Sequence, residues 1–427
     1  MNKRFFGVAL LSAVVCCLAS AAFADNWPRF RGPNATGASA ENGVPAVWTN
    51  EDIAWQIDLP GKGHSSPVIW DDTVFVTSTN EGGTRTWLTA LQASNGEQLW
   101  QQDYAMKPAR MHPFNSPAAS TPAVDANGVY VLWYAADRTL VSALSHGGDK
   151  RWTKEFGPVV QMHGASSSPA VYGDLLVFSL EQRENIDGRM SYWYALNPAN
   201  GEIVWRLERQ HGEEPASSSS PLLYQAADGT DQLVFSSKAY GIAAVDLKTG
   251  KEIWAADSAL GKRAVSSPVQ AGNLIVATCG RGSGPMELAA VAPPTDGSSK
   301  GRIVYSIIGG VAPYVPSPLA VNGRLFLFED KGKVSCLDAQ TGDVVWTERT
   351  RNKFFGSPVL IGDRIYCTDT RGKVVVIRAA DTYELLGVNE LGGPSNATPA
   401  IADSRMILRT ESQLTCIVGG MSEQAAR

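Results

Sequence analysis

A short pattern of apolar and polar positions recurs along almost the whole chain. Each repeat opens with a small residue and a proline. An apolar pair, a turn rich in Gly, Asn or Asp, and two further apolar runs such as residues 325–328 and 333–337 follow. Short apolar runs separated by such turns are typical of antiparallel strands joined by tight hairpins. The pattern therefore predicts an all-β fold with almost no helix.

The repeats are spaced like the blades of a β-propeller. Successive small-residue–proline pairs lie 40 to 55 residues apart, which is the length of one four-stranded blade. The eight pairs begin at Ser66, Thr121, Ser168, Ser220, Ser267, Ser317, Ser357 and Thr398. Because serines recur at the start of repeat after repeat, we interpret the Ser-rich stretches 166–168 and 217–220 as structural rather than nucleophilic.

Each repeat ends in a Gly-bearing turn and a strand that carries a large apolar residue, expected to dock between neighbouring blades. Residues 52–59 carry the same signal ahead of the first repeat, whereas the last repeat, residues 396–419, lacks it. We therefore expect the strand Asp52 to Leu59 to complete the last blade and to remove both open sheet edges. The eight docking positions are Trp55, Trp100, Trp152, Trp205, Trp254, Tyr305, Trp346 and Leu386. This count predicts an eight-bladed β-propeller, with seven blades and a separate hairpin as the alternative.

The N-terminus has the features of a secretory signal peptide. Lys3 and Arg4 precede an apolar stretch over residues 5–19, and Ala22-Phe23-Ala24 fits a signal-peptidase site. The apolar stretch is shorter than the ~20 residues that span a bilayer, so we expect no transmembrane segment. The predicted organisation is a signal peptide at 1–24, an N-terminal extension at 25–50, a single propeller at 51–420 and a tail at 421–427. Export places the protein in the periplasm or at the cell surface.

Charge and cysteine content narrow the possible partners. The net charge of −5 becomes −7 without Lys3 and Arg4, and no basic block is present, so we expect no nucleic acid partner. Four cysteines remain after the signal peptide, each within or at the end of an apolar run: Cys279, Cys336, Cys367 and Cys416. We expect buried free thiols, although export also permits disulfides.

The segment from Asp246 to Trp254, with its Asp-x-x-Thr-Gly-x-x-x-Trp spacing, resembles the pyrroloquinoline-quinone-like (PQQ-like) repeat. The resemblance covers about residues 50–420. The opening Trp27-Pro28-Arg29-Phe30-Arg31-Gly32-Pro33 is similar to the start of a group of exported bacterial members. The superfamily includes the scaffold propeller of outer-membrane assembly and, more distantly, the quinoprotein alcohol dehydrogenases. The resemblance thus implies a fold and not a reaction.

Quinone chemistry would require further residues. In the dehydrogenases that this chain resembles, a tryptophan and a disulfide of adjacent cysteines enclose the quinone ring beside Ca²⁺. The one adjacent pair, Cys16-Cys17, lies in the predicted signal peptide. We therefore expect no cofactor and a non-catalytic binding or scaffold propeller. A PQQ-dependent dehydrogenase that oxidises an alcohol or a sugar, with PQQ and Ca²⁺, is the alternative.

The loops that lead into the proline-marked strands carry most of the histidines and several cations. The predicted ligand-binding residues are Lys62, His64, Arg110, His112, His163, His211, Arg263 and Lys353, and Arg351 lies in the same loops. Such a face suits an anionic partner, either a protein segment or an acidic glycan. Ordinary loop polarity is the alternative. We expect no metal site, because the histidines stand at unequal distances from the following prolines, and we expect a monomer.

Overall fold

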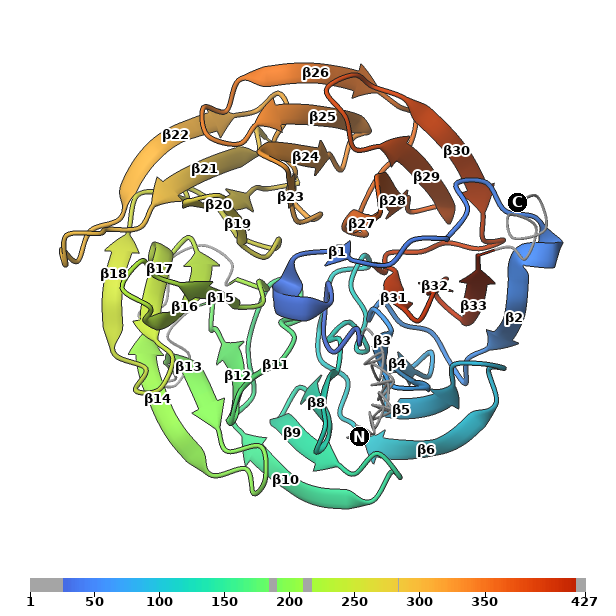
Figure 1. Cartoon of the computed structure of the whole chain (residues 1–427). Helices are drawn as coiled ribbons and strands as arrows, with labels where there is room; N and C mark the ends of the chain where they lie inside the picture. The colour runs from blue at the N-terminus through green and yellow to red at the C-terminus, as the bar shows by residue number, and fades with distance from the viewer. Residues whose placement is uncertain (1–25, 184–189, 210–216, 283, 420–427) are drawn as a thin grey trace, which may run out of the picture.

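The computed structural model describes residues 26–183, 190–209, 217–282 and 284–419. These residues form eight sheets arranged around a common axis (Figure 1), so the prediction of an eight-bladed propeller is confirmed and the seven-bladed alternative is wrong. The helices in this part of the chain are two short 3₁₀ turns, η1 Pro33–Ala35 and η2 Asn50–Asp52. Within the described residues no helix is long and apolar enough to span a bilayer.

The first four blades each consist of four consecutive strands, and the first strand of each lies nearest the axis (Figure 1). Blade 1 contains β3 Val68–Trp70, β4 Thr73–Thr79, β5 Arg85–Gln92 and β6 Gln98–Ala105. Blade 2 contains β7 Ala123–Asp125, β8 Gly128–Tyr134, β9 Thr139–Leu144 and β10 Lys150–Phe156. Blade 3 contains β11 Ala170–Tyr172, β12 Leu175–Leu180, β13 Ser191–Leu196 and β14 Ile203–Arg209. Blade 4 contains β15 Leu222–Gln225, β16 Asp231–Ser237, β17 Gly241–Asp246 and β18 Glu252–Ala256.

The remaining blades repeat this order, and the last two also take up strands from the N-terminal region. Blade 5 contains β19 Val269–Ala271, β20 Leu274–Cys279, β21 Glu287–Ala292 and β22 Arg302–Ile308. Blade 6 contains β23 Leu319–Val321, β24 Arg324–Phe328, β25 Lys333–Asp338 and β26 Val344–Arg349. Blade 7 contains β27 Val359–Ile361, β28 Arg364–Thr368, β29 Lys373–Arg378 and β30 Leu385–Glu390, with β1 Ala38–Ser39 added beside β27. Blade 8 contains β31 Ala400–Ala402, β32 Arg405–Arg409, β33 Gln413–Val418 and β2 Ile53–Asp58.

The ring closes through β2. This strand pairs antiparallel with β33, so that Trp55 stands opposite Cys416. The expected outer strand from Asp52 to Leu59 is therefore present as Ile53–Asp58. Because the N-terminal strand β2 completes the C-terminal blade, β33 is paired on both sides and the last blade has its full four strands.

The outer-strand aromatic residues fasten each blade to the next. The indole of Trp205, for example, donates to the carbonyl of Leu247 in the following blade at 2.9 Å. Gly250 in that turn has a φ of 68°, and a Cβ there would stand 2.5 Å from the Trp205 ring, so only glycine fits. Equivalent bonds of 2.7 to 3.0 Å link Trp55 to Ala93, Trp100 to His146, Trp152 to Pro198, Tyr305 to Ala339 and Trp346 to Ala380.

Two docking positions depart from this pattern, each for a local reason. The turn between β21 and β22 is extended by residues 293–300, and the Trp254 indole bonds Gln232 of its own blade at 2.8 Å instead. Leu386 has no indole. Beside it, the side chain of Asn389 donates to the Ala46 carbonyl and accepts from the Trp48 amide, so the N-terminal extension covers this junction.

The serines and threonines before the prolines form a second, inner fastening. The backbone amide of Ser66 donates to the hydroxyl of Thr121 in the next blade, and the amide of Thr398 joins the last blade back to the first through the Ser66 hydroxyl at 3.1 Å. Bonds of 2.9 to 3.0 Å also join Thr121 to Ser168, Ser220 to Ser267, Ser267 to Ser317, Ser317 to Ser357 and Ser357 to Thr398. In the Ser-rich stretches, Ser168 thus accepts within this ring, and the hydroxyls of Ser217 and Ser219 donate to the Ser236 carbonyl, which fits their structural interpretation.

The four cysteines of the described residues are buried free thiols, as expected. Each lies on a different blade: Cys279 on β20, Cys336 on β25, Cys367 on β28 and Cys416 on β33. They serve the packing between blades, because each belongs to one of the core clusters that fill those spaces.

Candidate functional site

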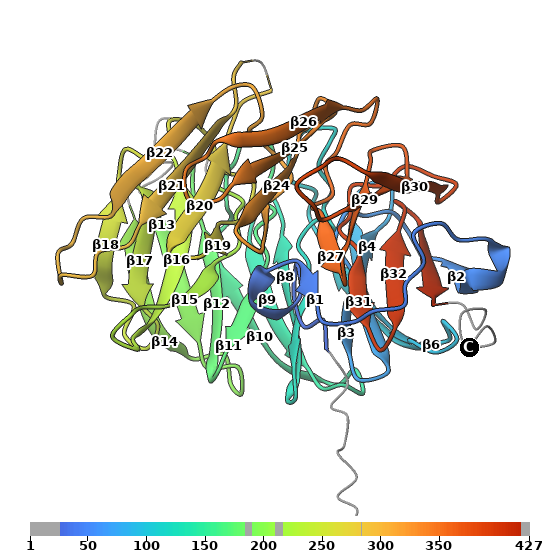
Figure 2. The ribbon, with the colours of Figure 1, turned by 45° about the horizontal axis from the view of Figure 1, so that its top comes forward.

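The propeller has two axial faces. We call the side with the loops that lead into the eight innermost strands the loop face, and the opposite side, where those strands end, the plug face. Because every blade is a meander of the same direction, all eight connecting loops lie on one face and the turns after the innermost strands lie on the other. Figure 2 shows the ring tilted, with the blades' strands running between these two faces.

Residues 26–39 cross the plug face, and this segment is the plug. Its backbone bonds to Ile69 of β3 in both directions at 2.9 Å, accepts from Val124 of β7 and, at Gly37, accepts from Leu360 of β27. Its elements η1 and β1 lie close to the axis in Figure 1. The chain's own N-terminal extension therefore closes this side of the propeller.

Two buried arginines anchor the plug. Arg29 donates to the Pro221 carbonyl at 2.7 Å and to the Tyr172 hydroxyl, and its guanidinium lies over the Tyr172 ring. Arg31 is fully buried and donates to the Pro318 carbonyl at 2.7 Å. Burial lowers the pKa of Arg31 to about 9. The arginines of the Trp-Pro-x-Phe-Arg-Gly-Pro motif thus bind inner-ring carbonyls far away in the sequence.

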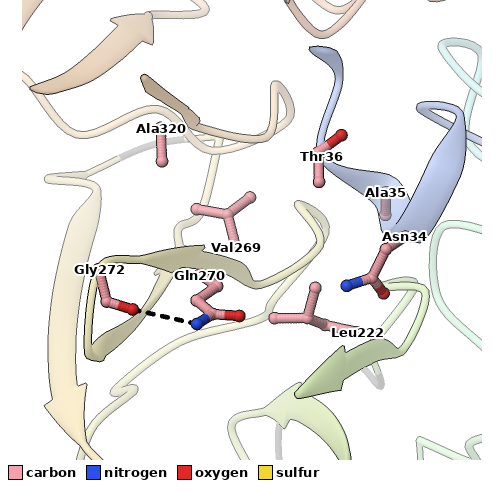
Figure 3. A pocket seen from close by; sticks show the side chains of 8 residues that line it. All are labelled: Asn34, Ala35, Thr36, Leu222, Val269, Gln270, Gly272 and Ala320. Atoms are coloured by element: carbon pink, nitrogen blue, oxygen red, sulfur yellow. Dashed lines mark hydrogen bonds between the residues drawn. The ribbon is translucent and has the colours of Figure 1, made fainter. Parts of the chain in front are cut away.

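A small hollow of about 290 Å³ lies on the plug face, between η1 and the inner strands of blades 4 to 6 (Figure 3). Its lining residues are Asn34, Ala35, Thr36, Leu222, Val269, Gln270, Gly272 and Ala320. The Asn34 side chain is paired with the backbone of Leu223, and the Gln270 amide donates to the Gly272 carbonyl at 3.0 Å. The lining carries no charged side chain, and its amides are engaged with backbone groups.

On the loop face, the predicted site residues separate into different environments. His64 is mostly buried at the junction of blades 8 and 1, where burial and then the charge of Arg409 lower its pKa to about 4. Lys62 is exposed and lies 3.9 Å from the Glu411 carboxylate. His64 is therefore a neutral part of the ring at physiological pH, whereas Lys62 faces solvent.

The structure brings His112 and His163 together. Their rings lie 5.1 Å apart, and the His163 carbonyl accepts from the His112 amide and from the Asn115 side chain. The pKa of His163 is lowered, first by partial burial and then by the charges of Arg263, His112 and Arg183. The two loops that lead into blades 2 and 3 are thus fixed to each other.

The other predicted cations differ in exposure. Arg263 is buried and donates to the hydroxyls of Ser218 at 3.0 Å and Tyr314 at 3.3 Å, so it connects loops of blades 4 to 6. Arg110, Arg351 and Lys353 are exposed. His211 lies outside the described residues, as do the predicted signal peptide and the tail at 421–427.

An aromatic pair on this face, one ring exposed and the other half-buried, was not predicted from the sequence. Phe114 is 65% exposed, and its ring lies 5.7 Å from that of Phe355 in an edge-on arrangement. Phe114 belongs to the loop between blades 1 and 2, whereas Phe355 belongs to the loop between blades 6 and 7. The contact therefore bridges loops that are not neighbours in the ring. The available signal was an aromatic residue amid the polar residues of the longest connecting loop, residues 106–122.

Buried carboxylates of the loop face were also not predicted. Glu181 accepts from the Ser217 amide, the Ser237 hydroxyl and Tyr240, and burial raises its pKa. Asp330 accepts from the amides of Tyr314 and Val315, yet burial raises its pKa to about 6. These acids hold loop backbone and side-chain donors in place. These carboxylates are therefore engaged in hydrogen bonds within the fold, whereas several cations of the same face are exposed to solvent.

The described residues do not fit a quinone site of the dehydrogenase kind. No group of three or more His, Cys, Asp or Glu side chains in this part of the chain could hold a metal ion. The four described cysteines lie on four separate blades, so no two of them can form the disulfide of adjacent residues that would face a quinone ring.

The family model described as outer membrane protein assembly factor BamB matches residues 41–112, 84–306 and 309–415. The curated BamB of Shewanella oneidensis is 19% identical over 270 residues, which cover 61% of this chain. The match spans 64% of that relative, which is less than two thirds of its length.

Solved structures show the same fold. The BamB structure from Moraxella catarrhalis has a TM-score of 0.58 and 15% identity, and the match covers 86% of this chain and 97% of that one. A quinohemoprotein alcohol dehydrogenase from Comamonas testosteroni has a TM-score of 0.63 and 14% identity, with 94% and 82% covered. At these identities the likeness extends to the fold alone, and it includes both an assembly factor and an enzyme.

Proposed function

Because the chain belongs to the family of the outer membrane protein assembly factor BamB, we propose that it is a non-catalytic scaffold that binds a protein partner through its loop face. The family name and the relative from Shewanella oneidensis point to a role in assembling other proteins. We also propose that the protein is exported to the periplasm or the cell surface and that it is a monomer.

The observation that carries this proposal is the difference between the two axial faces. The plug covers one face and uses its polar groups on inner-ring carbonyls and amides. The loop face instead carries exposed cations and the exposed ring of Phe114, which packs on Phe355. A scaffold needs accessible groups that its own fold has not consumed, and the loop face has them.

The charge of the loop face favours an anionic partner. Arg110, Arg351 and Lys353 are exposed there, whereas Glu181 and Asp330 are buried and already accept hydrogen bonds. A local cationic surface on an acidic chain attracts carboxylates, and arginine can bind them through two bonds. An acidic protein segment fits the family better than an acidic glycan, which becomes the other outcome of the test.

The test compares two triple variants of equal charge change. One carries Arg110→Ala, Arg351→Ala and Lys353→Ala on the loop face. The control carries Arg151→Ala, Lys248→Ala and Lys251→Ala, which are exposed near the turns of the plug side. Poly-L-glutamate should bind the wild type and the control alike, should bind the loop-face variant at least about tenfold more weakly, and should weaken with salt. Equal loss in both variants would contradict the loop face as the site, and preference for alginate over polyglutamate would favour a glycan.

The dehydrogenase alternative has its own test. The purified protein is incubated with PQQ and Ca²⁺ and assayed for dye reduction with alcohols and sugars. We expect no turnover, because the described residues lack the donor set for this cofactor. Stoichiometric PQQ binding with substrate-dependent dye reduction would replace the scaffold proposal with an enzyme.

A further inference from the structure

We infer that the partner presents an aromatic side chain within an acidic stretch, and that this side chain docks on an apolar patch formed by Phe114 and Phe355. The inference rests on the proposed function and adds the chemistry of the segment that is bound. A purely electrostatic surface would need only cations, but this one also exposes large apolar groups.

The patch is unusual for a surface that has no partner. Phe114 is 65% exposed, and Phe355 beside it is half-buried. Phe114 contacts His112 at 5.0 Å between ring centroids as well as Phe355 at 5.7 Å. Exposed apolar groups that gather and are rimmed by polar residues mark interaction sites more often than scattered ones do.

The patch is held in place before binding. The Phe114 amide donates to the His112 ring at 3.2 Å, and the Asn115 side chain donates to the carbonyls of His163 and Gly164. The loop between blades 1 and 2 is therefore fixed to the next connecting loop. A surface ordered in advance loses less conformational entropy when a partner binds, which favours affinity.

The surroundings of the patch determine the charge of the partner. Arg110 precedes Phe114 by four residues, and Arg351 and Lys353 precede Phe355 by four and two. All three are exposed. An aromatic ring docked against the exposed side of Phe114 would therefore lie over two loops that carry exposed cations. Aromatic side chains accept such a ring well, and carboxylates on either side would complement the rim.

The experiment compares two soluble polymers of matched length, poly-L-glutamate and a random glutamate–tyrosine copolymer. Isothermal titration or fluorescence anisotropy measures the affinity of each for the full mature chain. The wild type should bind the copolymer at least about tenfold more tightly per glutamate than polyglutamate, because one docked ring buries enough apolar surface for that ratio. The variant Phe114→Ala with Phe355→Ala should bind both polymers about equally.

A matched control removes exposed apolar groups elsewhere. Leu99→Ala with Ile308→Ala truncates exposed side chains on the outer strands β6 and β22 and should keep the preference for the copolymer. If the double Phe variant does not fold, Phe114→Ala alone serves, since that side chain is mostly exposed.

The outcomes distinguish the aromatic anchor from the scaffold function on which it rests. Equal affinity of the wild type for both polymers would overturn the aromatic anchor, while salt-sensitive binding of polyglutamate would leave the proposed scaffold function standing. Loss of the preference in the outer-strand control as well would also overturn the patch. Failure of both polymers to bind would contradict both the anchor and the anionic partner.

Discussion

The two axial faces of this propeller use similar residues in opposite ways. On the plug face, Arg29 and Arg31 are buried and donate to carbonyls of strands that lie more than a hundred residues away. On the loop face, Arg110 and Lys353 reach solvent. Arginine content alone therefore does not locate a binding surface. What distinguishes these side chains is whether the fold has buried them against its own acceptors, as it also does with Arg263 on the loop face.

The largest expected effect comes from removing the segment that builds the plug face. Deletion of residues 25–60 removes the plug and β2, including Trp55 and its bond to Ala93. Loss of one such tryptophan alone costs about 3–5 kcal/mol, and reopening the ring adds to that cost. We expect the free energy of unfolding to fall by more than about 5 kcal/mol in urea titrations.

A second variant separates the stability contributed by the plug from that contributed by the closing strand β2. Replacing residues 26–37 with a Gly/Ser linker keeps β2 and should destabilise the ring less than the full deletion. Unchanged thermal unfolding of the full deletion would contradict the closure described above.

The next effect is a dependence of stability on pH at His64, which is buried despite its position on the loop face. Arg409, Glu411, Lys62 and Asn396 surround this ring. The folded pKa of about 4 lies below the ordinary value of 6.5, so the unfolded chain binds the proton first as the pH falls. Above pH 6.5 the histidine is neutral in both the folded and the unfolded state, and stability has its full value. As the pH falls toward 4, the free energy of unfolding decreases by up to about 3 kcal/mol.

The matched variant for this prediction is His64→Gln, which keeps a polar side chain but cannot take up a proton between pH 7 and pH 4. Urea unfolding between pH 7 and pH 4 should show a smaller loss of stability in His64→Gln than in the wild type. Parallel pH profiles for the two proteins would show that His64 is not buried in its neutral form.

A smaller effect on stability is expected from the hydrogen bonds that join the Ser and Thr residues before the prolines from blade to blade, which we call the inner ring. Ser66→Ala removes the acceptor of the buried Thr398 amide, the bond that joins the last blade to the first. An unsatisfied buried amide costs about 1–2 kcal/mol. Ser94→Ala, at an exposed turn, should change stability by less than about 0.5 kcal/mol. Equal effects of the two substitutions would mean that the inner ring contributes no stability.

The smallest stability effect should belong to the loop-face patch. Phe114→Ala removes a side chain that is mostly exposed, so the melting temperature should hardly move and the free energy of unfolding should change by less than about 0.5 kcal/mol. Circular dichroism melts measure this change directly. A strongly destabilised Phe114→Ala would assign the aromatic pair to the fold rather than to binding.

The sequence predicted the parts of the molecule that repeat. The Ser/Thr-Pro pairs and the large apolar residues of the outer strands recur once per blade, so that each position was supported by seven others, and even the closing strand could be recognised from Trp55. The plug could not be predicted, because Arg31 and Pro318 are 287 residues apart and no local pattern links them. The histidines looked alike in the sequence, since burial separates His64 from His112 only after the loops have folded.

The aromatic pair of the loop face illustrates the same limit. Phe114 and Phe355 come from loops that the ring brings together, and nothing in either loop sequence indicates the contact. The candidate binding residues were therefore chosen by charge alone, and the apolar half of the surface was missed.

The most direct test of the central claim is hydrogen–deuterium exchange of the mature protein with and without the glutamate–tyrosine copolymer. The account predicts that binding slows exchange in residues 106–118 and 350–356 of the loop face, while residues 26–39 of the plug and the turns of the plug face exchange as before. Protection confined to the plug face or the outer strands, with the loop-face segments unchanged, would contradict the claim that this propeller binds through its loop face.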